Sequence, residues 1–145
     1  MPRHFTLEEA ESQLPEVNRL LGEAVAAKIE YDEVVLVLRA LAERVMLMGG
    51  MNLDRESALA CKARRDTATE QLREVVERVS DIGCLVKDLD SGLVDFPTLL
   101  GGREVYLCWK RGERAIAFWH GDEGFAGRKP VDAEFLRQHR GDDPS

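Results

Sequence analysis

The stretch from Gly83 to Pro130 decides the fold class, and it reads GCLVKDLDSGLVDFPTLLGGREVYLCWKRGERAIAFWHGDEGFAGRKP. It contains both tryptophans and most of the glycines of the chain. Short runs of β-branched and aromatic residues that are separated by glycines are typical of antiparallel strands. We therefore expect a small β-sheet in this part of the chain.

The first hairpin of this sheet is expected to pair residues 84–88 with residues 93–96. Gly92 ends the connecting turn and can adopt the positive φ that a three-residue hairpin with a bulge requires. In that register Lys87 would lie opposite Asp95, and the two side chains could form an ion pair.

A second hairpin is expected between residues 103–109 and 114–120. A turn of two or four residues would place Arg103 opposite His120. A turn of three residues would instead place Glu104 opposite His120 and create a carboxylate–imidazole pair. The sequence leaves these alternatives open.

The chain before Gly83 has a helical hydrophobic period. Thr6 and Glu9 form a capping box at the start of a helix. Pro15 predicts either a kink or a short first helix followed by a second one, because proline lacks a backbone donor and clashes with the preceding turn. Apolar residues then recur with alternating three- and four-residue spacing, which predicts two long helices in a coiled-coil-like antiparallel hairpin. The expected seams are Leu7, Ala10, Leu14, Val17, Leu21, Ala24, Tyr31, Val35, Leu38, Ala42 and Val45 in the first helix, and Cys61, Ala68, Leu72, Val75, Val79 and Ile82 in the second.

Residues 34–38 are consecutively apolar and would cover the whole circumference of the first long helix. A two-helix hairpin buries only one stripe of each helix. The C-terminal sheet or a second copy of the chain must therefore cover the other side, and the length of the helices favours a homodimer through the helices. The Met-rich connector at residues 45–53 would pack on its own helices or a second copy, or else contact another partner.

We expect one α+β domain over residues 1–145, a long antiparallel helical hairpin followed by a small four-stranded antiparallel sheet. The hairpin would occupy residues 6–82 and the strands with their final loop residues 83–131. A short helix would follow at 132–140, and 141–145 would form a disordered tail.

Composition limits the function classes. A net charge of −7 over 145 residues makes nucleic acid an unfavourable partner. The most apolar run is too short to span a bilayer, and no apolar signal core follows the first residues. Three cysteines without a CxxC pair suit a reducing cytoplasm, and we expect Cys84 and Cys108 to be buried and inert.

Several strings are shared with a known family. They are GLVDFP (92–97), GREVYLCWKRGE (102–113), WH (119–120) and GFAGRKP (124–130), behind FTLEEA (5–10). In these strings the chain resembles the bacterial family catalogued as domain of unknown function 2203. The family has no assigned activity, so the resemblance implies no catalytic residue or cofactor.

The candidate site lies in the strand-rich block, where charged and aromatic residues are dense. A pocket lined by aromatic residues with a few converging charges is the usual form of a small-molecule site. The candidate ligand-binding residues are Asp88, Asp95, Arg103, Glu104, Trp109, Trp119, His120 and Arg128. They favour a binding or interaction protein that recognises a small anionic ligand or a protein segment. Alternatively, both tryptophans are core residues, and His120 forms a hydrogen bond that only stabilises the fold.

A metal-assisted hydrolase or lyase is the alternative. Asp88, Asp95 or Glu104 would hold the ion and His120 would act as general base. Asp88, Asp95 and His120 are the candidate metal ligands, although no HxxxH or HExxH spacing accompanies them. The sequence therefore leaves open whether the protein is an enzyme.

Overall fold

The computed structural model describes residues 3–47 and 55–142. The chain forms two structural units, one of residues 1–21 with 77–145 and one of residues 22–76. Both long helices contribute residues to both units. Most of the Met-rich connector and the end of the expected tail lie outside the described residues.

The helical part begins with α1, Leu7–Ser12, and continues with α2, Leu14–Leu47. Thr6 caps α1 by accepting a hydrogen bond from the Glu9 amide, and the Glu9 carboxylate accepts one from the Thr6 amide, so the expected capping box is present. Gln13 interrupts the helix, and α2 begins at Leu14, one residue before Pro15. Of the two alternatives for this proline, a short first helix followed by a second one is confirmed.

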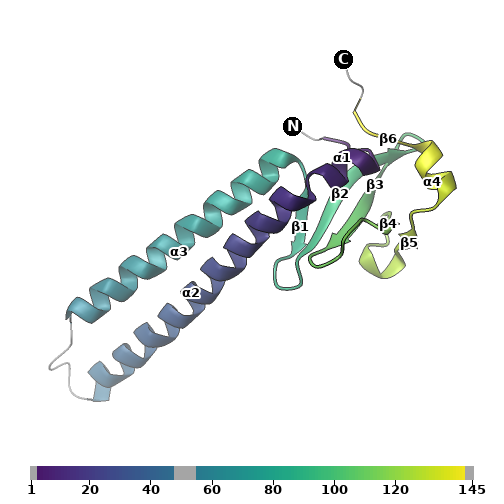
Figure 1. Ribbon diagram of the computed structural model, residues 1–145. Helices are drawn as coiled ribbons and strands as arrows, with labels where there is room; N and C mark the ends of the chain where they lie inside the picture. Colours follow the sequence, from purple (N-terminus) through teal and green to yellow (C-terminus); the bar gives the residue numbers. More distant parts are fainter. Residues whose placement is uncertain (1–2, 48–54, 143–145) are drawn as a thin grey trace. The chain divides into compact units, whose positions relative to one another are not determined.

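The second long helix, α3, spans Arg55–Ile82, and Figure 1 shows it running antiparallel beside α2. Within residues 22–76, Val34 of α2 and Ala68 of α3 are almost fully buried. An ion pair of 2.6 Å between Glu30 Oε1 and Arg64 Nε joins the two helices. The expected hairpin is therefore confirmed, and the seam predicted for α3 matches its buried and half-buried positions.

The seam predicted for α2 is partly wrong. Val34 is fully buried, whereas Val35 is only half-buried, and Leu41 is more buried than Ala42. The heptad pattern that starts with the buried residues Ala24 and Ala27 continues to Val34 and Leu41 with unchanged three- and four-residue spacing. Hydrophobicity could not show this, because every residue in 34–38 is apolar.

The sheet has six antiparallel strands in the order β1-β2-β3-β4-β5, with β6 pairing with β2. The α+β class is confirmed, and the sheet has two short strands more than expected. The strands are β1 Leu85–Asp88, β2 Leu93–Leu100, β3 Arg103–Lys110, β4 Phe118–His120, β5 Lys129–Pro130 and β6 His139–Arg140.

The C-terminal segment begins with α4, Ala133–Gln138, which Asp132 caps by accepting from the Phe135 amide at 2.8 Å. The predicted helix is therefore present, but it ends before β6. The two-residue strand β6 has no recognisable sequence pattern, because it forms only through its long-range pairing with β2. The Asp142 amide then donates to the His4 carbonyl at 3.0 Å, which holds the start of the expected tail.

The β1–β2 register differs from the expected one. Gly92 has the predicted positive φ of 72°, but Leu85 lies opposite Asp95. The pairing shifts between Val86 and Asp88, so Lys87 has no partner in the ladder. The expectation that Lys87 lies opposite Asp95 is wrong because this bulge displaces the strand.

Both registers expected for the second hairpin are also wrong. Tyr106 lies opposite His120, and seven residues separate β3 from β4. These residues form a packed loop in which Ile116 is buried and its amide donates to the Glu11 carboxylate at 3.2 Å. The contact with α1 favours the long loop over a tight turn.

The two faces of the sheet differ in chemistry. One face, here called the core face, carries Phe96 and Leu107, and Phe96 packs edge-to-face on Phe5 with ring centroids 5.3 Å apart. The opposite face, here called the site face, carries Asp95 and its neighbours. None of the described helices carries an apolar stretch long enough to cross a lipid bilayer.

Candidate functional site

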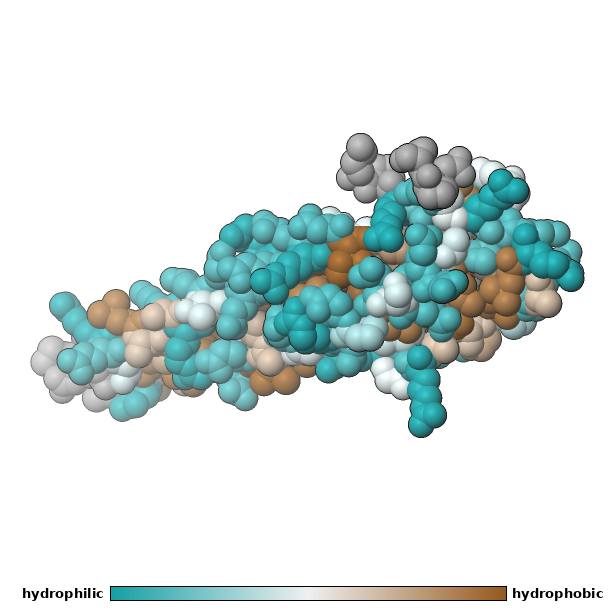
Figure 2. Space-filling model, turned by 45° about the horizontal axis from the view of Figure 1, so that its top comes forward, coloured by the Kyte–Doolittle hydropathy of each residue, from teal (hydrophilic) through white to brown (hydrophobic). Residues whose placement is uncertain are grey.

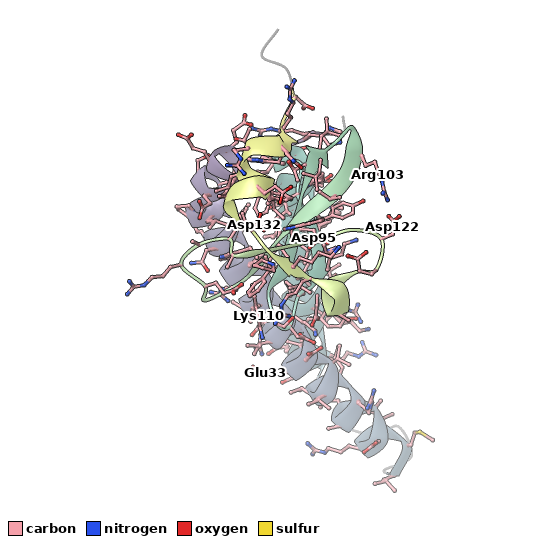
Figure 3. All side chains as sticks on the ribbon, turned by 90° about the vertical axis from the view of Figure 1, so that its right-hand side faces the viewer. Glu33, Asp95, Arg103, Lys110, Asp122 and Asp132 are labelled. Carbon is pink, nitrogen blue, oxygen red and sulfur yellow. The ribbon has the colours of Figure 1, made fainter. Side chains whose placement is uncertain are left out.

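A buried pair of polar side chains lies at the centre of the site face. Asp95 lies opposite Cys108, and Tyr106 lies opposite His120, so these four side chains share one face of three adjacent strands. Asp95 Oδ2 and His120 Nε2 are 2.9 Å apart, and their side chains are 1% and 7% exposed. Figure 3 shows Asp95 within the interior of the sheet region.

Both ring nitrogens of His120 face acceptors. Nδ1 lies 3.0 Å from the Gly121 carbonyl oxygen, which can only accept, so Nδ1 carries a proton. Nε2 faces the Asp95 carboxyl group, and one further proton must lie between these two groups. His120 therefore offers no free nitrogen to a bound molecule while this pair is intact.

The second oxygen of Asp95 has no such partner. Asp95 Oδ1 is buried without a hydrogen bond from any described residue. The donor atoms of Asp95, Cys108 and His120, with one carboxylate oxygen taken for Asp95, all lie within 4.8 Å of one another. Burial, together with the negative charges of Asp95 and Glu113, raises the pKa of the Cys108 thiol to about 12. As the sequence suggested, this thiol is buried, and its raised pKa disfavours the thiolate that a nucleophile requires.

A ring contact and two hydrogen bonds connect the pair to residues further out. The Tyr106 ring lies over the His120 ring at a centroid distance of 5.4 Å, and its hydroxyl donates to Glu104 Oε1 at 2.7 Å. The other Glu104 oxygen lies 2.9 Å from His4 Nε2. The hydrogen bond to Glu104 and partial burial raise the pKa of Tyr106 to about 12, and the hydrogen bonds from Tyr106 and His4 lower the pKa of Glu104. Tyr106 is thereby held as a neutral donor.

A cavity of about 390 Å³ opens beside the pair. Its lining residues are Lys87, Leu93, Asp95, Tyr106, His120, Gly121, Asp122 and Gly124. We call it the site cavity.

One wall of the site cavity is the loop that follows β4. The Glu123 carboxylate accepts a hydrogen bond from the Gly121 amide at 3.1 Å, and such backbone hydrogen bonds lower the pKa of Glu123. Gly127 approaches the Glu123 side chain so closely that a Cβ at this position would overlap it. The loop therefore requires glycine at this position to close in this conformation.

The charged residues that line the site cavity differ in whether they have an oppositely charged partner. Asp122 Oδ2 lies 3.9 Å from Arg103 Nη2, and both side chains are largely exposed at the rim (Figure 3). Asp95 and His120 together carry no net charge once they share the proton described above. Lys87 contacts the Tyr106 ring at 5.9 Å, and it is the one lining charge without an oppositely charged partner among the described residues.

Both tryptophans lie on the core face. Trp109 is buried and donates its indole N–H to the Glu113 carbonyl at 2.9 Å. Trp119 stacks on Phe135 of α4 with ring centroids 5.0 Å apart. These two candidate residues therefore pack within the protein and do not line the site cavity.

Two other candidates lie outside the site cavity. The Asp88 carboxylate accepts from the Asp90 amide at 3.3 Å and the Ser91 hydroxyl at 2.7 Å, so it stabilises the β1–β2 turn. The Arg128 guanidinium lies 4.9 Å from the centre of the Phe118 ring. The structure thus brings together Asp95 and His120, with Glu104 linked to them through Tyr106 and Arg103 at the rim.

Three residues that complete the site were not among the predicted set. They are Lys87, Tyr106 and Cys108. A correct β2–β3–β4 register would have found Tyr106 and Cys108, because strand residues two apart share a face. Lys87 reaches the site cavity from a bulge, which the sequence pattern did not show.

Comparison with known proteins gives a family but no activity. The model of a family described as "Uncharacterized conserved protein (DUF2203)" matches residues 3–131. No curated protein matches the chain. No solved structure matches it either.

Proposed function

The chain belongs to the DUF2203 family of uncharacterized conserved proteins, and from its site we propose that it is a binding protein for a small anionic molecule. The molecule occupies the site cavity, and the helical hairpin pairs two copies of the chain.

The unpaired charge of Lys87 carries this proposal. Asp95 pairs with His120, and Asp122 lies within ion-pair distance of Arg103. Lys87 has no ion pair among the described residues, so its charge can attract an anion. An ammonium group is a compact charge that attracts carboxylate and phosphate groups. The volume of about 390 Å³ lies within the range of small-molecule sites.

Binding is favoured over general-base catalysis by the hydrogen bonds of His120. A general base needs an accessible lone pair within reach of the proton that it abstracts. Both nitrogens of His120 already face acceptor atoms inside the protein. The pair therefore supports a rigid binding floor better than it supports proton abstraction.

Pairing of two copies is supported by a second apolar stripe on α2. Ile29 and Leu36 are 53% and 61% exposed, and they are seven residues apart, so they lie on one side of the helix. Leu47, eleven residues further, lies on the same side and is 86% exposed. Hydrophobic surface is visible along the helices at the left of Figure 2. A second hairpin would bury this stripe in a four-helix arrangement.

Thermal unfolding with a panel of small carboxylates and inorganic phosphate tests the binding function. We expect at least one anion to raise the Tm of the wild-type protein. The variant Lys87→Met should lose most of this shift, because it keeps the length of the side chain but removes its charge. Lys62→Met, which changes an exposed lysine of α3, should retain the shift.

Two results would overturn the proposal. One is that no anion of a broad panel stabilises the wild-type protein. The other is that Lys87→Met and Lys62→Met respond to the same anion as strongly as the wild type does.

A further inference from the structure

Three metal-binding side chains converge at the floor of the site cavity. Asp95, Cys108 and His120 come from the neighbouring strands β2, β3 and β4, and all three are buried. Their donor atoms lie within 4.8 Å of one another. Ligands at about 2.0–2.3 Å from a tetrahedral ion lie roughly 3.3–3.7 Å apart. The widest of these separations would therefore have to shorten by at most roughly 1–1.5 Å to bring all three onto one ion.

An unsatisfied oxygen points to a cation independently of this spacing. Asp95 Oδ1 is buried and accepts no hydrogen bond from the described residues. A buried carboxylate oxygen without a partner is costly, and buried charges are normally paired or coordinate metals. A metal ion bound at this oxygen would remove that cost.

The hydrogen bonds of His120 also suit a metal ligand. Nδ1–H donates to the Gly121 carbonyl, which leaves the Nε2 lone pair directed toward Asp95. Metal-binding histidines almost always donate their other ring N–H to a carbonyl, a carboxylate or water, which fixes the tautomer. Nε2 and Asp95 Oδ2 lie 2.9 Å apart, so a cation can take the place of the proton that they share.

We propose that Asp95, Cys108 and His120 bind one divalent transition-metal ion of the zinc class. Thiolate and imidazole select borderline-soft ions such as Zn²⁺, whereas Mg²⁺ and Ca²⁺ take oxygen ligands. Binding displaces the thiol proton and the proton that Asp95 shares with His120. The two negative charges that remain on the ligands balance the charge of the ion, so the buried site stays neutral.

Asp95 and His120 line the site cavity, so a further ligand would reach the ion from this cavity. Three protein ligands leave one position of a tetrahedral ion for water or another ligand. A carboxylate or phosphate near Lys87 could occupy it, and this part of the inference alone depends on the proposed binding of an anion. The metal site itself stands on the three side chains.

Cobalt binding to the metal-free, full-length protein tests the site. We expect one Co²⁺ per chain, with a thiolate-to-cobalt charge-transfer band in the near ultraviolet and displacement by one equivalent of Zn²⁺. Cys108→Ala should lose the band, whereas Cys84→Ala, which changes another buried cysteine, should retain it. Asp95→Asn should weaken Co²⁺ binding by more than the roughly 10–100-fold that loss of an outer-shell partner costs.

The inference is overturned if the wild-type protein shows no stoichiometric Co²⁺ binding, or if Cys108→Ala keeps the charge-transfer band. Far-ultraviolet circular dichroism checks the fold of each variant. If Cys108→Ala fails to fold, the Co²⁺ affinities of the wild type and Asp95→Asn are compared instead. Equal affinities would overturn the inference. Lys87→Met separates this site from the proposed function, because it should bind Co²⁺ normally while losing the response to anions.

Discussion

Asp95 Oδ2 lies 2.9 Å from His120 Nε2, in a pair whose side chains are 1% and 7% exposed. The pair joins β2 and β4, which are separated in the sheet by β3. It therefore forms a polar contact across the middle strand at the floor of the site cavity.

An amide and an apolar side chain at position 95 should affect the free energy of unfolding differently. In Asp95→Asn, the amide N–H can donate to Nε2 of His120 while Nδ1–H still donates to Gly121. In Asp95→Leu, Nε2 stays buried without a partner, which should lower the free energy of unfolding by about 1–3 kcal/mol. Urea unfolding measures both, and an equal loss in the two variants would contradict this role of the pair.

Glu104 should contribute to stability against acid. Its pKa is lowered by the hydrogen bond from Tyr106 and then by His4, from an ordinary value of 4.5. A carboxyl group with a lowered pKa stabilises the folded state above its ordinary pKa, and this contribution is lost as the pH falls through the lowered value. Glu104→Gln should therefore flatten the acid side of the stability profile measured by urea unfolding between pH 3 and pH 7.

A matched control for this profile is Glu74→Gln, which changes an exposed glutamate of α3. It should leave the acid side of the profile as it is in the wild type. A profile of Glu104→Gln that coincides with the wild-type profile would contradict the proposed contribution.

Gly127 should be coupled to Glu123. A methyl group at position 127 would overlap the Glu123 side chain, so Gly127→Ala should lower the free energy of unfolding by about 1–3 kcal/mol. In a Glu123→Ala background the overlap is absent, and the same substitution should cost clearly less. A double-mutant cycle by urea unfolding measures this coupling. Additive effects of the two substitutions would show that the loop does not close around Glu123.

The exposed apolar stripe of α2 should hold two copies of the chain together. Leu36→Glu places a charge in the stripe and should convert a dimer into a monomer, because burial of an unpaired charge is unfavourable. Lys62→Glu changes an exposed residue of the other helix, α3, and should remain dimeric. Light scattering after size-exclusion chromatography measures the mass, and a monomeric wild-type protein would contradict the pairing.

The sequence was informative where local chemistry determines the structure. The capping box at Thr6, the helix break before Pro15, the positive φ of Gly92 and the Asp132 cap are short-range features, and all are present. The α+β class followed from the change of hydrophobic period at Gly83. These features depend on residues that are close in the chain.

Register depended on contacts between distant residues. The long loop before β4 is held by Ile116 and its contact with Glu11, more than one hundred residues away, and the bulge at Lys87 has no distinctive sequence. A register error moves side chains to other partners or to the other face. For this reason Asp95 and His120 could be named as candidates, whereas their joint contact with Cys108 and Tyr106 could not.

Chemical-shift mapping of the backbone amides tests the central claim, that the site cavity is where the protein binds its ligand. An anion that raises the Tm would be added to ¹⁵N-labelled protein. We predict that the largest shift changes fall on Lys87, Gly121, Asp122 and Gly124, which line the site cavity. Changes confined to other residues, such as those of the helical hairpin, would contradict the account.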